Sequence, residues 1–236
     1  MATVVRERND PRQYDDLAHE WWDPGGAFCA LHWLAAARAA LVPEAAAPGA
    51  LLVDVGCGGG LTAPHLAGKG YRHIGVDIGA QAARIAREHG VVAVQADAHR
   101  LPIASGVADV VVAGEILEHV VDLDAVVAEV ARILRPGGLL VIDTLADTRL
   151  CKLLMVTIAE RARVAPYGIH DPALFVDPDR LVRLCATGGI ALRVHGLRPA
   201  LGQGLAWLAG RRVDVQMLRT RFTNVVYQGV GVKAGA

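Results

Sequence analysis

The chain has 236 residues, with 24 basic and 24 acidic side chains and a hydrophobic share of 53%. A chain of this length buries a large core in one domain, so we expect a single domain over residues 1–236. Its zero net charge excludes a general nucleic-acid binder, which carries a basic excess. The N-terminus is charged, and no apolar run is long enough to span a membrane, so we expect a cytoplasmic protein.

In chain order, the first predicted element is a helical, aromatic-rich stretch over 12–45, within an N-terminal extension over 1–48. Strand-length apolar runs then alternate with helical periodicity. Strands are predicted over 51–55, 73–77, 91–95, 108–113, 139–144, 190–194 and 225–232, and helices over 61–67, 80–89 and 122–134. This alternation predicts an α/β fold, a Rossmann-like doubly wound, seven-stranded and mostly parallel sheet.

A glycine-rich turn carries the strongest chemical signal. Asp54-Val-Gly56-Cys-Gly58-Gly-Gly60 follows the first predicted strand and precedes a helix. Glycines permit the tight turn and let a ligand approach the backbone. Asp77, at the end of the second strand, is placed to accept the hydroxyl protons of a ribose. The sequence therefore predicts a nucleotide site.

The turn differs from a dinucleotide site. Leu61 stands where G-x-G-x-x-G has its last glycine, and Asp54 would repel a pyrophosphate. An acid there suits a ligand with a cationic end, such as a methionine amino group. The pattern D-x-G-x-G-x-G, followed by an acid after the next strand, resembles class I S-adenosylmethionine-dependent methyltransferases.

Later motifs extend this resemblance over residues 51–144. Gln95-Ala-Asp97-Ala98 follows the third strand, where the superfamily places an acid near the adenine. Gly114-Glu115-Ile-Leu-Glu118-His119 resembles its E-x-L-E-H element, and Leu134-Arg-Pro-Gly-Gly138 its L-x-P-G-G turn. The resemblance implies that Ile78, Asp97 and Ala98 also line the cofactor site.

The flanks are similar to a narrower family, the ubiquinone-pathway polyprenyl-catechol O-methyltransferases. The similarity rests on Glu20-Trp-Trp-Asp23, Gly168-Ile-His170-Asp171 and Arg212-Val-Asp214. It implies that S-adenosylmethionine contacts Arg38, Gly56, Asp77 and Gly114, and that the acceptor is a hydrophobic small molecule. Two positions depart from the family: Gly114 is usually larger, and Asp143-Thr-Leu replaces an asparagine-bearing sequence.

The acceptor's phenolic proton has to be removed before its oxygen attacks a methyl group, because a phenol is mostly neutral at pH 7. Glu115, Glu118 and His119 have the spacing at which one helical turn brings side chains together. Two roles stay open. In the first role, all three residues bind Mg²⁺ or another divalent ion, which the resemblance implies because mitochondrial relatives of the family use such a Glu-Glu-His site. In the second role, His119 acts as general base, with Glu115 beside it.

An insertion over 148–178 separates the fifth and sixth strands. It combines Leu150, Leu153, Met155 and Ile158 with cations such as Arg149, which is the pattern of a helix at a membrane surface. A lid packed on its own domain is the alternative. For the protein, the alternatives to a polyprenyl-catechol O-methyltransferase are a methyltransferase of another metabolite and a non-catalytic cofactor-binding module.

Overall fold

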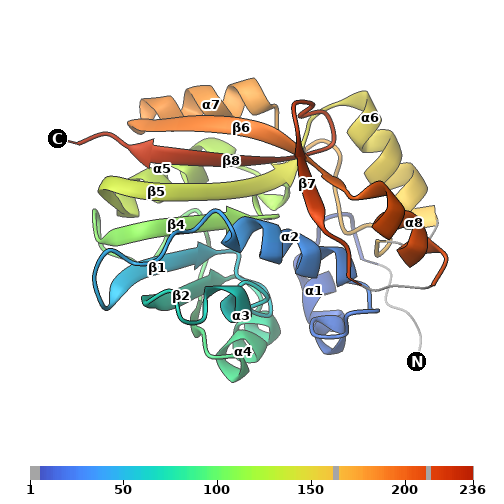
Figure 1. Cartoon of the computed structure of the whole chain (residues 1–236), viewed down its shortest axis with the longest axis horizontal. Coiled ribbons are helices and arrows are strands. Elements are labelled where there is room, and N and C mark those ends of the chain that lie inside the picture. Colours follow the sequence, from blue (N-terminus) through green and yellow to red (C-terminus); the bar gives the residue numbers. More distant parts are fainter. Residues whose placement is uncertain (1–5, 162–164, 211–213, 236) are drawn as a thin grey trace.

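A single eight-stranded sheet forms the centre of the computed structural model, which describes residues 6–161, 165–210 and 214–235 (Figure 1). The strand order is β3-β2-β1-β4-β5-β8-β6-β7. The strands are β1 (Ala50–Val55), β2 (Tyr71–Asp77), β3 (Val92–Gln95), β4 (Ala108–Gly114), β5 (Leu134–Leu145), β6 (Ile190–Pro199), β7 (Met217–Thr220) and β8 (Val226–Lys233). In the order β3-β2-β1-β4-β5, each strand is parallel to the next. Strand β8 is antiparallel to both β5 and β6, and β7 is antiparallel to β6.

Helices surround this sheet and form the N-terminal extension. They are α1 (Arg12–Asp16), η1 (Ala18–Glu20), α2 (Cys29–Ala39), α3 (Ala63–Leu66), α4 (Ala80–Glu88), η2 (Leu117–His119), α5 (Leu123–Ile133), α6 (Arg149–Cys151), η3 (Lys152–Ala159), α7 (Pro178–Thr187) and α8 (Leu201–Leu208). η1 and η2 are 3₁₀-helices and η3 is a π-helix.

The predicted α/β Rossmann-like fold is confirmed, with eight strands where the sequence predicted seven. The additional strand is β7, which pairs with the second half of β6 over Gly196–Pro199. It has four residues and lies at the sheet edge, so its pairing uses backbone atoms and leaves little side-chain periodicity to detect. Helices α7 and α8 were also not predicted.

Alternate strand residues enter two separate cores. Val53 and Val55 of β1 face the helix pair α5 and α7, whereas Leu52 faces Ala39 and Leu66 on the other side of the sheet. This alternation follows from the two-residue repeat of a strand, and buried apolar residues on both faces require helices on both sides.

Helix α5 illustrates how local sequence defines an element. The Asp122 carboxylate accepts a hydrogen bond from Ala125 N at 3.0 Å, which satisfies a backbone donor that the first turn leaves free. The predicted apolar stripe is buried, with Val126 and Ile133 both at 0% exposure. The helix predicted over 61–67 is shorter and covers only Ala63–Leu66.

The order in which successive strands are added to the sheet reverses between β1 and β4, because β2 and β3 lie on one side of β1 and β4 and β5 lie on the other. In open parallel sheets, ligands bind at such a switch point beyond the carboxyl ends of the strands. Figure 1 shows α1, α2, α6 and α8 gathered at this end of the sheet. The N-terminal extension and the 148–178 insertion therefore cover the same end of the sheet, where the parallel strands have their carboxyl ends.

Candidate active site

The glycine turn and Asp77 meet as the sequence predicts. Gly56, Gly58 and Gly60 all have positive φ angles, from 52° to 82°, which favour glycine. Asp77 accepts hydrogen bonds from Gly58 N and from Gly79 N, both at 2.8 Å. Burial raises the pKa of Asp77, and the two N–H groups oppose that effect. The carboxylate thus fixes the turn from the end of the neighbouring strand.

Aromatic residues of the N-terminal extension lie directly on this turn. A Cβ atom at Gly58 would be 2.4 Å from the Trp21 ring, so the missing side chain makes room for that indole. Trp21 stacks on Phe28 with ring centroids 4.4 Å apart, and Trp22 Nε1 donates to Gly59 O at 2.9 Å. Trp21 Nε1 is buried without a hydrogen-bond partner among the described residues. The extension is therefore a cover over the turn, which sequence alone did not establish.

Arg38 reaches the carboxyl ends of β4 and β5 from helix α2. Its Nε and Nη2 donate to the two carboxylate oxygens of Asp143 at 2.8 and 2.7 Å, and Nη1 lies 3.3 Å from Thr62 Oγ1. Both members of the ion pair are buried, with side-chain exposures of 7% and 0%. The guanidinium lies against Gly114, where a Cβ atom would be 1.8 Å from Arg38 Cζ.

Asp54 is buried close to this ion pair, and its charge contributes to raising the pKa of Arg38. Its Oδ2 is 3.4 Å from His73 Nε2 and makes no hydrogen bond within the described parts of the chain. A buried carboxylate oxygen without a donor favours a cationic partner. This geometry fits the predicted preference for a ligand amino group.

The remaining predicted cofactor residues, Ile78, Asp97 and Ala98, follow strands β2 and β3. Ile78 is 51% exposed, directly after β2. Asp97, after β3, accepts from His99 N at 2.9 Å and contacts His99 Nδ1 at 2.6 Å, and the first of these bonds is the main cause of its lowered pKa. Ala98 packs against the main core. The structure does not bring these residues into contact with Arg38.

Two glutamates follow β4, of which Glu118 is buried and Glu115 is partly buried. Glu115 has a φ of +51°, which turns the chain sharply at the end of the strand. Glu118 Oε2 accepts a hydrogen bond from Thr144 Oγ1 at 2.7 Å, and the Oε1 atoms of both glutamates lack partners among described residues. Burial raises the pKa of both carboxyl groups, and the charge of Glu118 adds to the shift of Glu115.

His119 is held by two residues that the sequence analysis did not select. Asn9 Nδ2 donates to His119 O at 2.9 Å, which directs Asn9 Oδ1 at His119 Nδ1, 2.6 Å away. Because a carbonyl oxygen only accepts, Nδ1 carries the proton and Nε2 accepts from Tyr14 OH at 3.0 Å. Burial lowers the pKa of His119 to about 3, so the ring is neutral at physiological pH.

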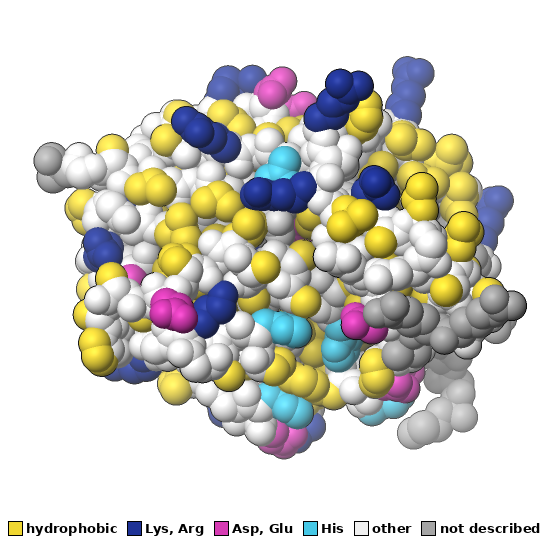
Figure 2. All heavy atoms as spheres, viewed as in Figure 1, with side chains coloured by type: hydrophobic (Ala, Val, Ile, Leu, Met, Phe, Trp, Pro, Cys, Tyr) yellow, Lys and Arg dark blue, Asp and Glu magenta, His cyan; other side chains and the backbone are white. Residues whose placement is uncertain are grey.

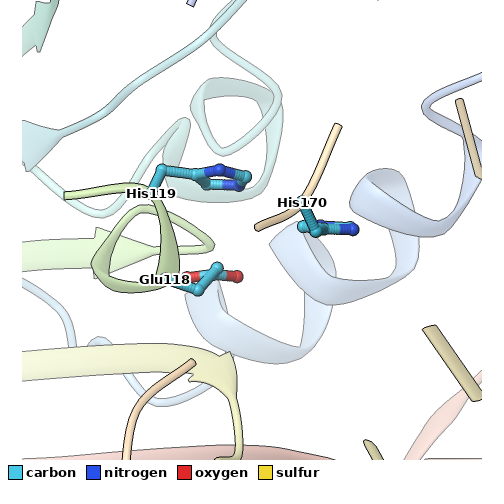
Figure 3. Close-up of side chains that lie close together, drawn as sticks. All are labelled: Glu118, His119 and His170. Carbon is cyan, nitrogen blue, oxygen red and sulfur yellow. The ribbon is translucent and has the colours of Figure 1, made fainter. Parts of the chain in front are cut away.

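The set of Glu115, Glu118 and His119 stays a prediction, and the structure places His170, rather than Glu115, beside both Glu118 and His119. Within the described ranges, the group of potential metal ligands consists of Glu118, His119 and His170, whose ligand atoms lie within 4.8 Å of one another (Figure 3). The reason is local: η2 is a 3₁₀ turn and Glu115 precedes it with a positive φ, so α-helical spacing does not apply. His170 comes from the 148–178 insertion. In the sequence it stood out only as part of the family motif Gly168-Ile-His170-Asp171.

A surface pocket of about 580 Å³ lies elsewhere, between the N-terminal extension and the outer side of α4. Asp15, Trp22 and Arg84 are among the residues that line it, and none of the predicted site residues does. It therefore adds nothing to the site at the glycine turn.

The fold and the site together define a class. The family profile described as "Methyltransferase domain" matches residues 53–142, which span β1 to β5. A structure of an S-adenosylmethionine-dependent methyltransferase from Thermotoga maritima has the same fold, with a TM-score of 0.65 at 19% identity over 94% of this chain and 97% of that one. The chain is a class I S-adenosylmethionine-dependent methyltransferase.

Its relatives define the family more narrowly. The ubiquinone biosynthesis O-methyltransferase of Thiobacillus denitrificans is 36% identical over 187 residues, 75% of this chain and 81% of that protein. The protein of the same name from Ralstonia nicotianae is 35% identical over 227 residues, 89% of this chain and 91% of its own. The chain belongs to the family of the ubiquinone biosynthesis O-methyltransferases.

Proposed function

We propose that this methyltransferase acts on a phenolic or catechol hydroxyl of a hydrophobic, polyprenyl- or quinone-like small molecule. The names of the relatives support O-methylation. The observation that carries the proposal is the neutral His119, whose Nε2 accepts a hydrogen bond from Tyr14 OH in the turn that follows β4. Such a group suits the removal of a proton from an acceptor hydroxyl.

The cofactor fits the residues around the turn. Asp77 is our candidate for the ribose hydroxyls, and Asp54 Oδ2 and Trp21 Nε1 are buried polar atoms that need partners. We further assign cofactor contacts to Arg38, Gly56, Gly58, Gly60, Ile78, Asp97, Ala98 and Gly114. When bound, S-adenosylmethionine supplies an activated methyl group on a sulfonium, and its amino-acid end carries both an amino group and a carboxylate.

The residues of the chain then position the acceptor and manage its proton. The acceptor hydroxyl would take the place of Tyr14 OH at His119 Nε2, and Nε2 would accept the hydroxyl proton and leave the oxygen as a nucleophile. Asn9 keeps the proton on Nδ1, so that Nε2 presents its lone pair. The glutamate pair favours retention of a proton at the buried site, because burial and mutual repulsion disfavour two charges.

A divalent ion is a second candidate, because Glu118 Oε1 and His170 Nδ1 are buried without partners in the described chain. Glu118, His119 and His170 would hold it, with Tyr14 displaced from His119. It would act as a Lewis acid on the acceptor oxygen. The two roles make different demands on His119, whose ring nitrogens both have protein partners here.

We also propose that the insertion and α8 contact a membrane and receive a lipid-soluble acceptor. Leu150, Leu153 and Ile158 of the insertion and Leu201 and Leu205 of α8 are between 42% and 69% exposed. Figure 2 shows apolar side chains gathered over this end of the molecule. None of the described helices is long and apolar enough to cross a membrane.

Binding and turnover test the proposed activity directly. Calorimetry with S-adenosylhomocysteine should show binding, and Asp77→Ala should weaken it roughly tenfold to hundredfold, the scale of charge-assisted hydrogen bonds. Asp124→Asn, an exposed acid paired with Arg180, is the matched control and should bind like the parent. Incubation with a lipid extract and labelled methyl donor should give a methylated product. Cofactor binding without any product would favour a non-catalytic module, and a water-soluble product would favour another metabolite.

A chelator separates the two roles of His119. With His119 as base, activity in excess EDTA is unchanged, and His119→Ala loses about 10²–10⁴ in rate, recovered as pH approaches the pKa of the phenol. With a divalent ion, EDTA abolishes activity, Mg²⁺ restores it, and Glu118→Gln is as harmful as His119→Ala. Co-sedimentation with anionic vesicles tests the membrane contact. Equal recovery in the supernatant with and without vesicles at low salt would contradict it.

A further inference from the structure

The Arg38–Asp143 ion pair uses only one edge of the guanidinium. Asp143 binds Nε and Nη2, which form the side edge of the planar group. The end edge consists of the remaining N–H bonds of Nη1 and Nη2, and a guanidinium has five N–H donors in all. Among the described residues, one of these N–H bonds, from Nη1, donates to Thr62 Oγ1 at 3.3 Å. A second carboxylate can therefore bind end-on while Asp143 stays in place.

The backbone of β4 makes this orientation possible. Gly114 and Asp143 are register partners on adjacent parallel strands, so the glycine provides the space and the aspartate the charge for one guanidinium. A Cβ atom at Gly114 would lie 1.8 Å from Cζ and 1.9 Å from Nε of Arg38. Any side chain at that position would displace the guanidinium from Asp143.

The carboxylate of Asp54, which can bind a cation, lies in the same region. Asp54 Oδ2 is buried and makes no hydrogen bond among the described residues, with His73 Nε2 3.4 Å away, and Asp54 interacts electrostatically with Arg38. The N–H bonds that the end edge of Arg38 retains beside the one to Thr62 attract an anion, and Asp54 attracts a cation. Two opposite groups at one site complement an α-amino acid in its zwitterionic form.

We propose that Asp143 is a positioning residue that holds Arg38 side-on, so that the end edge of Arg38 binds the carboxylate of the cofactor while Asp54 binds its amino group. The inference rests on the proposed cofactor contacts of Arg38 and Asp54, and adds Asp143 and Gly114 as the parts that orient the arginine. Asp143 makes no contact with the cofactor itself.

The test compares two ligands that differ in one group. S-adenosylhomocysteine has the carboxylate, and its decarboxylated analogue lacks only that group. Calorimetry on the full chain should show that the parent prefers S-adenosylhomocysteine by roughly tenfold or more, the scale of a bidentate charge-assisted contact. Asp143→Asn keeps the shape and removes the charge. It should lower this preference several-fold and leave the affinity for the decarboxylated analogue unchanged.

Two further variants keep the result interpretable. Gly114→Ala should reduce the same preference with Asp143 intact, because it displaces the guanidinium. Arg135→Lys is the control, since it alters another arginine–carboxylate pair, with Asp109, near the starts of β5 and β4 and so at the opposite end of these strands from Gly114 and Asp143. Each preference is a ratio of two affinities from one preparation, so unfolded protein lowers the stoichiometry and not the ratio.

Three results would count against the proposal. Equal weakening of both ligands in Asp143→Asn would mean a structural role only, and unchanged affinities would mean no role. Tighter binding of S-adenosylhomocysteine would mean that Asp143 competes with the cofactor's carboxylate instead of orienting Arg38. A parent that binds neither ligand would refute the proposed cofactor site itself, and the inference with it.

Discussion

Removing Arg38 should destabilise the fold more than removing any exposed cation. Asp143 is at 0% exposure and both of its carboxylate oxygens accept from Arg38, at 2.7 and 2.8 Å. Arg38→Met leaves this carboxylate buried without its counter-ion, and such a loss costs about 3–5 kcal/mol. For a chain of this size that corresponds to a fall of roughly 6–20 °C in Tm.

The double variant separates charge from packing. Arg38→Met with Asp143→Leu removes both charges, and replacing a whole buried pair by apolar residues is often close to neutral. We therefore expect urea denaturation to show most of the lost stability restored in the double variant. Arg180→Gln breaks an exposed pair with Asp124 and should cost at most about 1 kcal/mol. A single variant within 1 kcal/mol of the parent, or a double variant no better than the single, would refute this reasoning.

Three further changes have expected outcomes. Trp21 is 5% exposed and lies on Gly58, so Trp21→Ala should lower the free energy of unfolding by about 3–5 kcal/mol, measured with denaturant. A loss under 1 kcal/mol would mean that the N-terminal extension is not packed on the glycine turn. Burial lowers the pKa of His170 to about 4, so its stabilising contribution is present above pH 6.5 and is lost as pH falls towards 4. Against His170→Gln, the parent should lose about 3 kcal/mol over that range, and parallel pH profiles would contradict it. Asp122→Ala removes the cap of α5 and should cost about 1 kcal/mol, whereas Asp122→Asn should retain most of it; equal losses in both variants would argue against capping.

Features that depend on neighbours in the chain were predictable from sequence. The turn Gly56 to Gly60, the position of Asp77 and the apolar stripe of α5 follow from short-range rules on φ angles, strand length and helical period. The α/β fold follows from the same alternation. Residues 162–164, within the 148–178 insertion, and 211–213, which include Arg212 of a predicted motif, lie outside the described parts of the chain.

The two glutamates that follow β4 show where short-range rules end. Glu115, Glu118 and His119 have helical spacing, yet the chain turns at Glu115 with a positive φ and continues as a 3₁₀ helix. Spacing predicts side-chain convergence only when the backbone conformation is known, and here the exit from a buried strand determined it. His170 joined the cluster from 51 residues beyond His119 in the sequence.

The sequence by itself determined seven of the eight strands, the glycine turn and the acid at the end of β2, because each arises from local backbone geometry and the burial of apolar side chains. Tertiary structure alone decided the partners of the charged and polar groups. Arg38 meets Asp143 across 105 residues, and Asn9 meets His119 across 110. The physical reason is that a buried polar group must find its partner wherever the folded chain brings one, and no local pattern encodes that distance.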